Sequence, residues 1–269
     1  MDLGLSGRRA IVTGASRGIG RAVAAALVAE GARVLLVARG AEALAAAAGE
    51  LAAAGATAGG SVETFAADVT DPVAAPAIVA AARERLGGLD VLVNNAGSSA
   101  NVPLERLTEA DWELQWQLNV RAPERLMAAA APVMAASGWG RIVNVASSSG
   151  KRSSATNVAY SVAKSAQLAL SRAYAEAWAA KGVLVNAVAP GPTATELWTA
   201  PGGLADQAAA ARGITREEAL AAAAARTPRG RIGEPAEIAD VVLFLCSERA
   251  SNVVGAAWSA DGGAVPSIL

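Results

Sequence analysis

The chain has 269 residues, 53% of them apolar, and a net charge of −1 with the basic residues dispersed along the sequence. This length fits one large α/β domain or two small ones, and the apolar content is enough for a sizeable core without disulfides or metal. The dispersed charge argues against a nucleic-acid partner, because proteins that bind nucleic acids concentrate positive charge.

Two scarce residue types narrow the chemistry further. The sequence has no histidine, which excludes histidine general bases, Ser-His-Asp triads and histidine-ligated zinc, and we expect no metal site. Cys246 is its single cysteine, so an internal disulfide is excluded and a cytoplasmic location is expected. Residues 1–9 lack a basic start followed by an apolar core, so we expect no signal peptide. The apolar runs fall short of the roughly 20 residues of a spanning helix, so we expect no membrane partner.

Short β-branched runs alternate with Ala/Leu-rich stretches along the chain. In chain order we expect a strand at 9–13, a helix at 18–30, a strand at 33–38, a helix at 41–54, a strand at 62–67, a helix at 72–86 with Pro72 in its first turn, a strand at 90–94, a helical region at 108–136 interrupted by Pro123 and Pro132, a strand at 141–146, a helix at 157–181, a strand at 184–189, a helix at 234–247 and a strand at 256–259. Continuous apolar strands separated by helices predict a parallel sheet covered on both faces. We therefore expect a single doubly wound, Rossmann-type α/β domain over residues 1–269, with seven strands.

Residues 201–227 break this alternation with a Gly pair followed by an Ala-rich, charged helix. They follow the carboxyl end of a strand, where ligands bind in such folds. We therefore expect a substrate lid at about residues 197–228. Apolar side chains at Val102, Leu197, Trp198 and Leu204 fit a pocket wall, although each also fits ordinary packing of the lid.

A glycine-rich turn joins the first expected strand to the first helix. It reads Thr13-Gly14-Ala15-Ser16-Arg17-Gly18-Ile19-Gly20, so the gap of three residues comes first, unlike the usual G-x-G-x-x-G order. Glycines let the backbone approach a pyrophosphate, and the helix N-terminus supplies amide donors and a positive dipole end. This context predicts a nucleotide site that includes Gly14, Ser16, Arg17, Gly18, Ile19 and Gly20, the alternative being a tight turn without a ligand.

The end of the second strand predicts which nucleotide binds. NAD sites place Asp or Glu there for the ribose 2′-hydroxyl, whereas this chain has Ala38 followed by Arg39. Two guanidinium groups, Arg17 and Arg39, suit a 2′-phosphate and favour NADP(H). Either arginine alone fits a solvated surface charge equally well. Glu42 is close in sequence, but it falls in the first turn of a helix, where acids are common.

The segment Tyr160-Ser161-Val162-Ala163-Lys164 completes a recognisable pattern. With it, nearly the whole chain resembles the short-chain dehydrogenase/reductase family. The marks of the resemblance, in order, are the turn Thr13 to Gly20, Asp68-Val69, Asn94-Asn95-Ala96-Gly97, Asn119, Ser147, Tyr160-x-x-x-Lys164 and Pro190-Gly191-Pro192-Thr193-Ala194-Thr195.

The Tyr160 and Lys164 pair makes chemical sense without the family. A free tyrosine has a pKa near 10, too high for easy proton exchange at neutral pH. Lys164 lies one helical turn later on the same face, where its ammonium would stabilise the tyrosinate and lower that pKa. Ser147 follows a strand and could polarise the substrate oxygen. Taken singly, such a pair fits packing beside a solvated charge, and Ser147 fits an ordinary loop.

The resemblance assigns further roles. Asn119 would hold a water in a proton relay with Lys164. The remaining cofactor contacts would come from Asp68 and Val69 at the adenine, from Asn95, Ala96 and Gly97 near the ribose, from Tyr160 and Lys164, and from Pro190, Gly191, Thr193 and Thr195 at the nicotinamide carboxamide and pyrophosphate. Lys151 and Arg152 lie near the expected mouth, where they fit solvated charges better than ligands of a substrate carboxylate.

We therefore interpret the sequence as an NADP(H)-dependent oxidoreductase, a ketoreductase that moves hydride between the nicotinamide and a ketone or secondary alcohol, with Tyr160 as general acid/base. The partner is then a small carbonyl or alcohol substrate. One alternative is a 3-oxoacyl-acyl-carrier-protein reductase, against which count a long segment at residues 191–231 and the lack of basic residues from Ser137 to Gly140. Another is a catalytically idle NADP-binding regulator.

The resemblance also implies a homo-oligomer, a homotetramer or else a dimer. The long helical regions at 108–136 and 157–181 are the expected interfaces. Trp112, Trp116 and Trp178 on them fit interface aromatics or ordinary core equally well.

Overall fold

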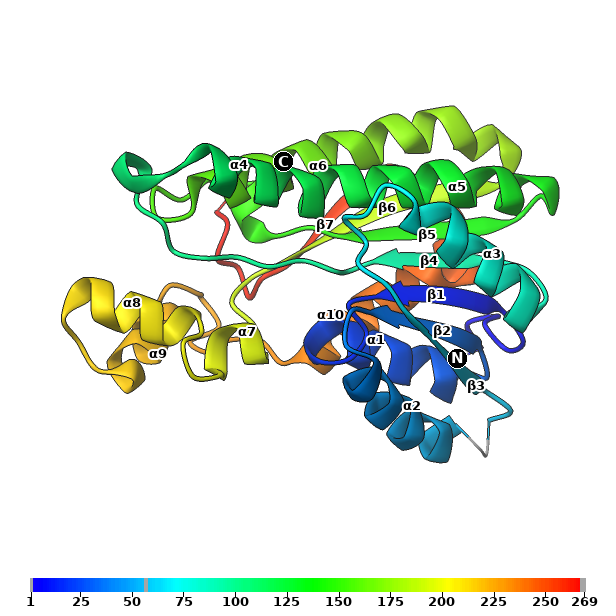
Figure 1. The fold of residues 1–269 in the computed structure, drawn as a ribbon, viewed down its shortest axis with the longest axis horizontal. Helices are drawn as coiled ribbons and strands as arrows, with labels where there is room; N and C mark the ends of the chain where they lie inside the picture. Colours follow the sequence, from blue (N-terminus) through cyan, green and yellow to red (C-terminus); the bar gives the residue numbers. More distant parts are fainter. Residues whose placement is uncertain (1, 56–57, 267–269) are drawn as a thin grey trace.

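The computed structural model describes residues 2–55 and 58–266, and seven parallel strands form one sheet at its centre (Figure 1). The strands are β1 (Arg9–Thr13), β2 (Arg33–Ala38), β3 (Ser61–Ala66), β4 (Val91–Asn94), β5 (Gly140–Val145), β6 (Val183–Pro190) and β7 (Ala257–Ala260). Their spatial order is β3-β2-β1-β4-β5-β6-β7. The chain order reverses between β1 and β4, and a crevice opens at the carboxyl ends of the strands at such a switch point.

Helices connect successive strands, as parallel pairing requires. They are α1 (Gly18–Ala29), α2 (Ala41–Gly55), α3 (Ala74–Leu86), α4 (Glu109–Trp116), α5 (Ala122–Ala136), α6 (Val158–Trp178), α7 (Glu196–Thr199), α8 (Leu204–Arg212), α9 (Arg216–Ala225) and α10 (Pro235–Cys246). A π-helical stretch, η2 (Gln117–Arg121), joins α4 to α5, and short 3-10 turns occur at η1 (Leu104–Arg106), η3 (Ser148–Gly150), η4 (Ala179–Lys181) and η5 (Glu248–Ala250).

Two apolar cores lie on opposite faces of the sheet. Alternate strand residues point to opposite faces, so Ala10 and Val12 of β1 join α1, α2 and α10, whereas Ile11 joins α3, α5 and α6. The central strands are buried on both faces and therefore consist almost wholly of apolar residues. This double burial fixes the sheet and, with it, the loops at the carboxyl ends of the strands.

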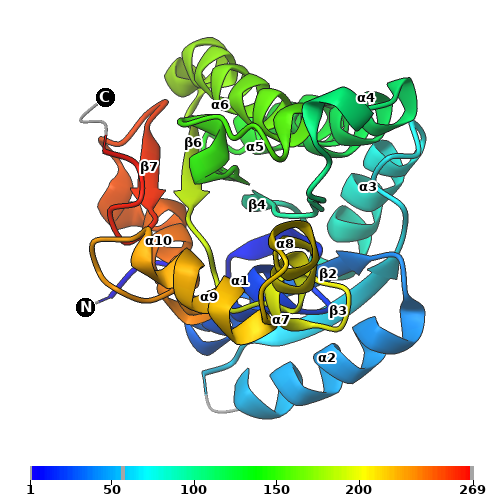
Figure 2. The same ribbon diagram turned by 90° about the vertical axis from the view of Figure 1, so that its left-hand side faces the viewer.

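The helices α7, α8 and α9 stand away from the sheet beyond the end of β6 (Figure 1). Viewed from that side, they lie between the helices α4 to α6 and the helix α2 (Figure 2). We call residues 196–225 the projecting segment. Its buried side chains are one leucine and several alanines: Leu204, Ala205, Ala209, Ala219 and Ala223.

The structure confirms the doubly wound sheet of seven strands, and the strand ends differ from the expected ones by one residue at most. Two details of the helices were wrong. The helix α3 begins at Ala74 rather than Pro72, because the Asp71 carboxylate accepts the Val73 amide in a turn before the helix. The region 108–136 is broken by the π-helical stretch around Asn119, whereas Pro123 sits in the first turn of α5 and Pro132 lies within that helix.

Among residues 2–55 and 58–266, no helix combines the length and apolar content needed to cross a membrane. The same described residues contain no cluster of three acidic or cysteine side chains that could hold a metal ion.

Candidate active site

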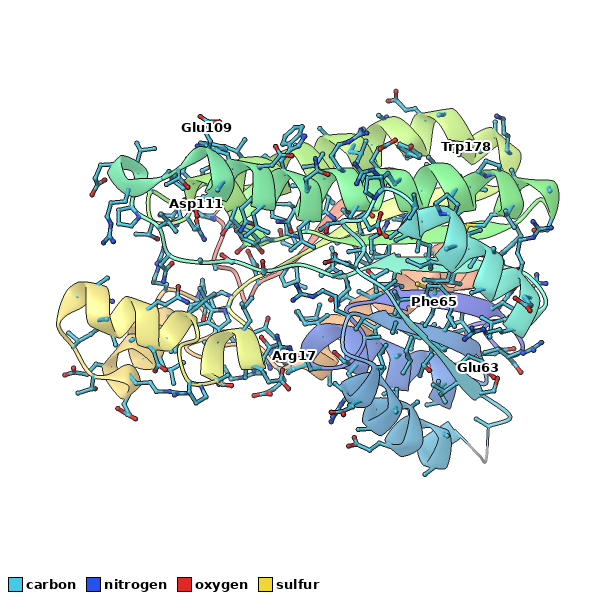
Figure 3. The ribbon with its side chains drawn as sticks, viewed as in Figure 1. Arg17, Glu63, Phe65, Glu109, Asp111 and Trp178 are labelled. Atoms are coloured by element: carbon cyan, nitrogen blue, oxygen red, sulfur yellow. The ribbon has the colours of Figure 1, made fainter. Side chains whose placement is uncertain are left out.

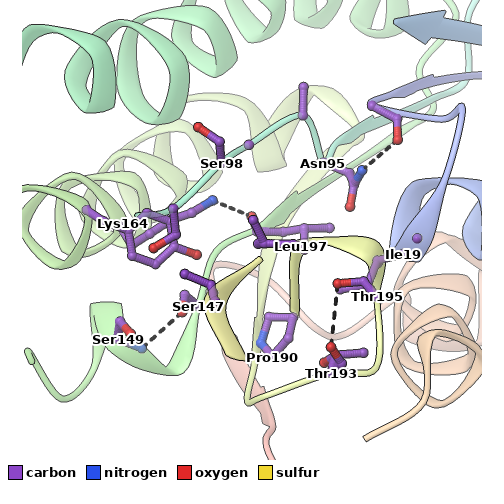
Figure 4. Close-up of a pocket in the computed structure, with 18 of the residues that line it drawn as sticks. Ile19, Asn95, Ser98, Ser147, Ser149, Lys164, Pro190, Thr193, Thr195 and Leu197 are labelled. Atoms are coloured by element: carbon purple, nitrogen blue, oxygen red, sulfur yellow. Dashed lines mark hydrogen bonds between the residues drawn. The ribbon is translucent and has the colours of Figure 1, made fainter. Parts of the chain in front are cut away.

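A cavity of about 1290 Å³ lies between the carboxyl ends of the strands and the projecting segment. Every residue that the sequence assigns to catalysis or to the cofactor lines this cavity, except Gly20 and Asn119. Figure 4 shows part of it, with Ile19 and Thr195 near one end and Ser147 and Lys164 near the other. The fold thus brings segments from the whole length of the chain to one site.

The glycine turn forms one end of the cavity. Gly14 and Gly18 have φ angles of +65° and +56°, which favour glycine. Gly20 lies behind the turn, where a Cβ would stand 2.4 Å from the carbonyl oxygen of Gly14. Arg17 is the N-cap of α1 and makes no side-chain cap, so the first amides of the helix are free of a side-chain acceptor. This cradle fits a phosphate group.

Hydrogen bonds from the residues that follow β4 hold the same turn in place. The Thr13 hydroxyl accepts the backbone amides of Asn95 and Ala96, both at 3.0 Å. The Asn95 side chain donates to the carbonyl oxygen of Thr13 at 2.9 Å and to that of Gly14 at 3.3 Å. Asn95 therefore also anchors the turn to the sheet, in addition to lining the cavity where the resemblance places the ribose.

Charged groups line the end of the cavity that this turn forms. Arg39 follows β2 and is exposed, and Arg17 lies at the start of α1 on the side that faces α7 (Figure 3). The Asp68 carboxylate accepts the hydroxyl and the amide of Thr70 at 2.7 and 2.9 Å. These hydrogen bonds, helped by the charge of Arg39, hold the pKa of Asp68 below its ordinary value. Both cations suit an anionic group, and Asp68 remains ionised beside them.

Ser147 and Tyr160 face the cavity from the loop after β5 and from the first turn of α6. The Ser147 hydroxyl accepts the amide of Ser149 at 3.1 Å, which orients it (Figure 4). Burial raises the pKa of Tyr160, and the Ser147 hydroxyl acts in the opposite direction. The sequence predicts that Lys164 lowers this pKa, but in the structure burial is the largest influence and the net direction at Tyr160 is upward.

Lys164 lies one turn further along α6 and is only 3% exposed. Its ammonium donates to the carbonyl oxygen of Val145 at 2.8 Å and to the side-chain oxygen of Gln167 at 2.9 Å. The nitrogen lies 5.7 Å from the centre of the Tyr160 ring. Burial lowers the pKa of Lys164 to about 7, so both the charged and the neutral form of its side chain are populated at neutral pH.

Asn119 lies outside the cavity wall but next to Lys164. Its side-chain amide donates to Gln115 at 2.8 Å, while its side-chain oxygen is buried without a hydrogen-bond partner. A Cβ built at Gly97 would lie 3.3 Å from this oxygen and 3.7 Å from the Lys164 nitrogen. An acceptor and a donor therefore flank the bare backbone of Gly97, which is the polar environment that an ordered water requires.

The segment after β6 forms the wall between these two ends. A Cβ at Gly191 would lie 2.9 Å from the backbone of Asp261, so only glycine fits there. The buried Thr193 hydroxyl donates to the carbonyl oxygen of Gly191 at 3.0 Å, and the Thr195 hydroxyl lies 3.5 Å from the carbonyl oxygen of Thr193. These bonds lie within the segment and fix its turn, whereas the Gly191 amide ties the segment to β7 by donating to the carbonyl oxygen of Ala260 at 3.2 Å.

The sequence missed much of the wall around Tyr160. Leu197, Trp198 and Leu204 line the cavity as expected, whereas Val102 instead forms a backbone bridge with Asn157. Apolar side chains that the sequence did not single out, such as Leu114, Leu118 and Val265, also line the cavity. So do several hydroxyl and amide side chains, namely Ser98, Ser99, Asn101, Ser148, Ser149, Ser153, Ser154, Thr156 and Asn157. The serine-rich run after β5 was the available signal, but loop sequences do not say which side chains turn inward.

Lys151 and Arg152, which the sequence places near the mouth of the cavity, differ in their contacts. The Lys151 ammonium donates to the carbonyl oxygen of Ala257 at 2.6 Å and to the Ser259 hydroxyl at 2.9 Å, so it fastens the loop to β7. Arg152 is exposed and lines the cavity.

Comparison with known proteins agrees with this site. A family model described as short chain dehydrogenase matches residues 8–201. The 3-oxoacyl-acyl-carrier-protein reductase FabG of Vibrio cholerae is 34% identical over 97% of this chain and 98% of its own length. Galactitol 2-dehydrogenase of Agrobacterium fabrum is 35% identical over 96% and 98%. The structure of L-sorbose reductase from Gluconobacter frateurii, complexed with NADPH and L-sorbose, is 34% identical with a TM-score of 0.92 and full coverage of both chains.

The chain therefore belongs to the short-chain dehydrogenase/reductase family. It is an oxidoreductase that acts on a ketone or an alcohol, and a nicotinamide nucleotide is the cofactor expected for this family.

Proposed function

We propose that this protein is an NADP(H)-dependent oxidoreductase that interconverts a ketone and a secondary alcohol, with Tyr160 as general acid/base. One observation carries the proposal: Ser147, Tyr160 and Lys164 line the same cavity as the glycine turn that fits a phosphate. The hydroxyl groups that can protonate a substrate oxygen thus share one cavity with the cofactor cradle.

The choice of NADP(H) is supported by Arg17 in the glycine turn and by Arg39 after β2, both of which line the cavity. A guanidinium group recognises a phosphate with two parallel hydrogen bonds, whereas a ribose hydroxyl needs an acidic acceptor. Ala38 occupies the end of β2, where such an acceptor would stand. The family relative from Gluconobacter was itself solved with NADPH.

The residues would act as follows in the direction of ketone reduction. A bound nicotinamide nucleotide supplies the hydride that the carbonyl carbon receives. Tyr160 gives its hydroxyl proton to the carbonyl oxygen, and Ser147 donates a hydrogen bond to the same oxygen. The positive charge of Lys164 stabilises the tyrosinate that remains. A water held between Asn119 and Lys164 returns the proton from solvent. Alcohol oxidation runs through the same groups in reverse.

Replacing Tyr160 by phenylalanine tests this assignment. The change keeps the ring that packs at the start of α6 but removes the transferable proton, and the sequence has no histidine to substitute for it. We expect turnover to fall by at least about a hundredfold while NADPH still binds. Turnover is measured by NADPH absorbance, and binding by quenching of protein fluorescence. Near-normal turnover in Tyr160→Phe would remove this residue from the mechanism.

We propose that the substrate is small and carries hydroxyl groups beside the reacting carbon. The support is the wall of serine, threonine and asparagine side chains near Tyr160, because a site built to hydrogen-bond hydroxyls strongly rejects substrates without them. Relatives named for L-sorbose and galactitol fit this class. A panel of ketoses and hydroxyketones against matched unsubstituted ketones tests it, and equal rates for both sets would contradict it.

A second candidate is reduction of a 3-oxoacyl group on an acyl carrier protein, because the FabG relatives match at similar identity. The apolar side chains of Leu197, Trp198 and Leu204 could contact an acyl chain. Ser137 to Gly140 contain no basic residue, but the guanidinium groups of Arg8 and Arg141 lie 3.6 and 4.4 Å from the centre of the Trp139 ring, so cations are present beside this stretch. A 3-oxoacyl thioester in the same panel separates the candidates. Turnover of any substrate would exclude the idle NADP-binding regulator.

We also propose a cytoplasmic homo-oligomer, a tetramer or else a dimer. Apolar side chains remain exposed on α4 and α6, with Leu114 at 53%, Trp116 at 42% and Val162 at 42%. Large exposed apolar groups on neighbouring helices are typical of subunit interfaces. Cys246 is buried and free, as a reducing compartment allows. Sedimentation velocity measures the assembly, and a monomer at micromolar concentration would contradict it.

A further inference from the structure

Gln167 occupies an unusual place on α6. Its side chain is 1% exposed and lies on the face of the helix that packs against the sheet, together with Ala163 and Ala175. A primary amide buried at such a position lowers stability unless it finds hydrogen-bond partners. The proposed mechanism makes no use of this residue, so its partners need an explanation.

The partner of the Gln167 side chain is Lys164. The Lys164 ammonium donates to the Gln167 side-chain oxygen at 2.9 Å, from three residues earlier on the same helix. An ammonium group has donors only, so the amide must present its oxygen rather than its nitrogen. The second acceptor of the same ammonium is the Val145 carbonyl at the end of β5. Lys164 is thus held from two sides, by the sheet and by its own helix.

The backbone of Gln167 is anchored as well. The Ser171 hydroxyl donates to its carbonyl oxygen at 2.7 Å and accepts the Asn144 side chain at 2.8 Å. Asn144 in turn accepts the Asn94 side chain at 2.8 Å. This buried chain of hydrogen bonds ties α6 to β5 and β4. The helical turn that carries Gln167 is therefore fixed relative to the sheet, and so is the oxygen that meets Lys164.

We propose that Gln167 is a positioning residue, whose amide oxygen keeps the Lys164 ammonium charged and fixed at the end of β5, within reach of Tyr160. The effect of Gln167 on catalysis rests on the proposed function, whereas its hydrogen bond to Lys164 does not. Lys164 lies between Tyr160, one turn before it on α6, and Gln167, one turn after it.

The environment of Lys164 makes this acceptor important. Burial alone lowers the pKa of Lys164 to about 7, so a small further decrease would leave the side chain mostly neutral at neutral pH. Tyr160 is the ionisable side chain whose ring faces it. Lys151, on the loop that packs against α6, is turned to β7. The other elements packed on this part of α6 carry charged side chains that are exposed or are bonded to a neighbour in their own segment. These side chains are Glu109, Asp111, Glu113 and Arg121.

The first test measures the free energy of unfolding of the ligand-free protein against pH. A lysine whose pKa is near 7 when folded and near 10.5 when unfolded binds more protons in the unfolded state between these values, so stability rises with pH across that window. Gln167→Met keeps the length of the side chain but removes the acceptor. The pKa of Lys164 in the folded state should fall by about one unit, since losing a hydrogen bond to a charged group changes its protonation equilibrium by about tenfold. The rise in stability should then begin about one pH unit lower.

Two further variants keep this test decisive. In a Lys164→Met background, Gln167→Met should no longer alter the shape of the pH curve. Ser171→Ala removes a buried polar group one turn further along α6, and should lower stability equally at every pH. If Gln167→Met only lowers the curve in parallel, as Ser171→Ala does, Gln167 is structural and the proposal is wrong. Should Gln167→Met not fold, Gln167→Glu should move the onset to higher pH, because a carboxylate favours the ammonium; an unmoved onset would equally overturn the proposal.

The second test follows alcohol oxidation against pH. Loss of charge on Lys164 raises the pKa of Tyr160, so in Gln167→Met the rising limb of kcat should move to higher pH by about one unit, with the KM for the alcohol unchanged. A loss of kcat that is the same at every pH would overturn the positioning role. If the unmutated enzyme turns over no alcohol at all while the stability curves behave as described, the proposed function fails and the Gln167 contact stands.

Discussion

The two sides of the cavity are built in different ways. On the side of the sheet, Ser147 follows β5, and Tyr160 and Lys164 come from α6. A partly buried hydrogen bond to Ser149 fixes Ser147, and buried hydrogen bonds to Val145 and Gln167 fix Lys164. On the other side, the projecting segment buries mainly alanines, and each alanine adds little apolar contact.

Backbone bonds fasten the projecting segment at its base. The Gly233 amide donates to the carbonyl oxygen of Pro192, and the Ala194 amide donates to the carbonyl oxygen of Gly233, both at 2.8 Å. The segment therefore leaves and rejoins the body at one place. Across the cavity, the Asn101 amide donates to the Gln207 side chain of α8 at 2.9 Å. Within the segment, Arg216 pairs with Asp206 at 3.3 Å.

This difference shows how one molecule meets two demands. Proton transfer needs groups held to a fraction of an ångström, which buried hydrogen bonds to a sheet provide. Admission of substrate needs a wall that opens, and a segment with few large buried side chains has a low cost of local opening. The predictions that follow disturb first the rigid side and then the movable one.

The largest effect on cofactor binding should come from adding a side chain at Gly20, where the glycine turn leaves no space for one. Gly20→Ala would place a Cβ 2.4 Å from the backbone oxygen of Gly14, so the turn must shift. Displacing the phosphate cradle by about an ångström should weaken NADPH binding by about a hundredfold. Titration calorimetry measures this loss.

Gly49→Ala provides the matched control. Gly49 lies within α2 with nothing near a Cβ built on it, so alanine there should raise stability by about 0.5–1 kcal/mol and leave binding unchanged. If Gly20→Ala binds NADPH as well as Gly49→Ala does, the turn is not the rigid cradle that we describe.

A smaller effect is expected at Arg39, where we place the 2′-phosphate of NADP(H). Arg39→Asp replaces an exposed cation beside the cavity with an acid that suits a ribose hydroxyl and repels a phosphate. The preference for NADPH over NADH should fall or reverse by about tenfold or more, because a hydrogen bond to a charged group is worth roughly 1.5–3 kcal/mol. Arg83→Asp changes the net charge equally on α3 and should leave the preference intact. Equal affinity of the unmutated protein for the two nucleotides would contradict the choice of NADP(H).

The rigid side was also the side that the sequence could predict. Residues of the sheet obey a simple rule, since a strand buried on both faces must be apolar, as Val91 to Val93 are. The residues from Thr13 to Gly20 and the pair Tyr160 and Lys164 are close in sequence, so their spacing alone carries their geometry. The cavity that unites them follows from the order of the strands.

Other features depend on tertiary contacts that leave little trace in a single sequence. The π-helical stretch at Asn119 was hidden in a helical pattern, since one extra residue per turn does not change composition. Gln167 lies in an otherwise ordinary helix, and only the fold shows that it faces Lys164. The contact between Asn101 and Gln207 joins a loop to the helix α8, and the two residues are more than a hundred positions apart in the sequence.

The smallest predicted change is at that contact. We propose that the projecting segment is a substrate lid, and that the bond between Asn101 and Gln207 helps to hold it closed. Gln207→Ala should raise the KM for the substrate about fivefold with little change in kcat, because one neutral hydrogen bond is worth about 1 kcal/mol. Arg212→Ala, exposed at the end of the same helix, should leave both constants unchanged. Amide hydrogen exchange should show residues 204–226 protected on addition of NADP and substrate, and less so in Gln207→Ala. Strong protection of these residues that ligands do not alter would make the segment a fixed scaffold, and substrate selection would then have to come from the loops that begin at Gly97 and Ser147.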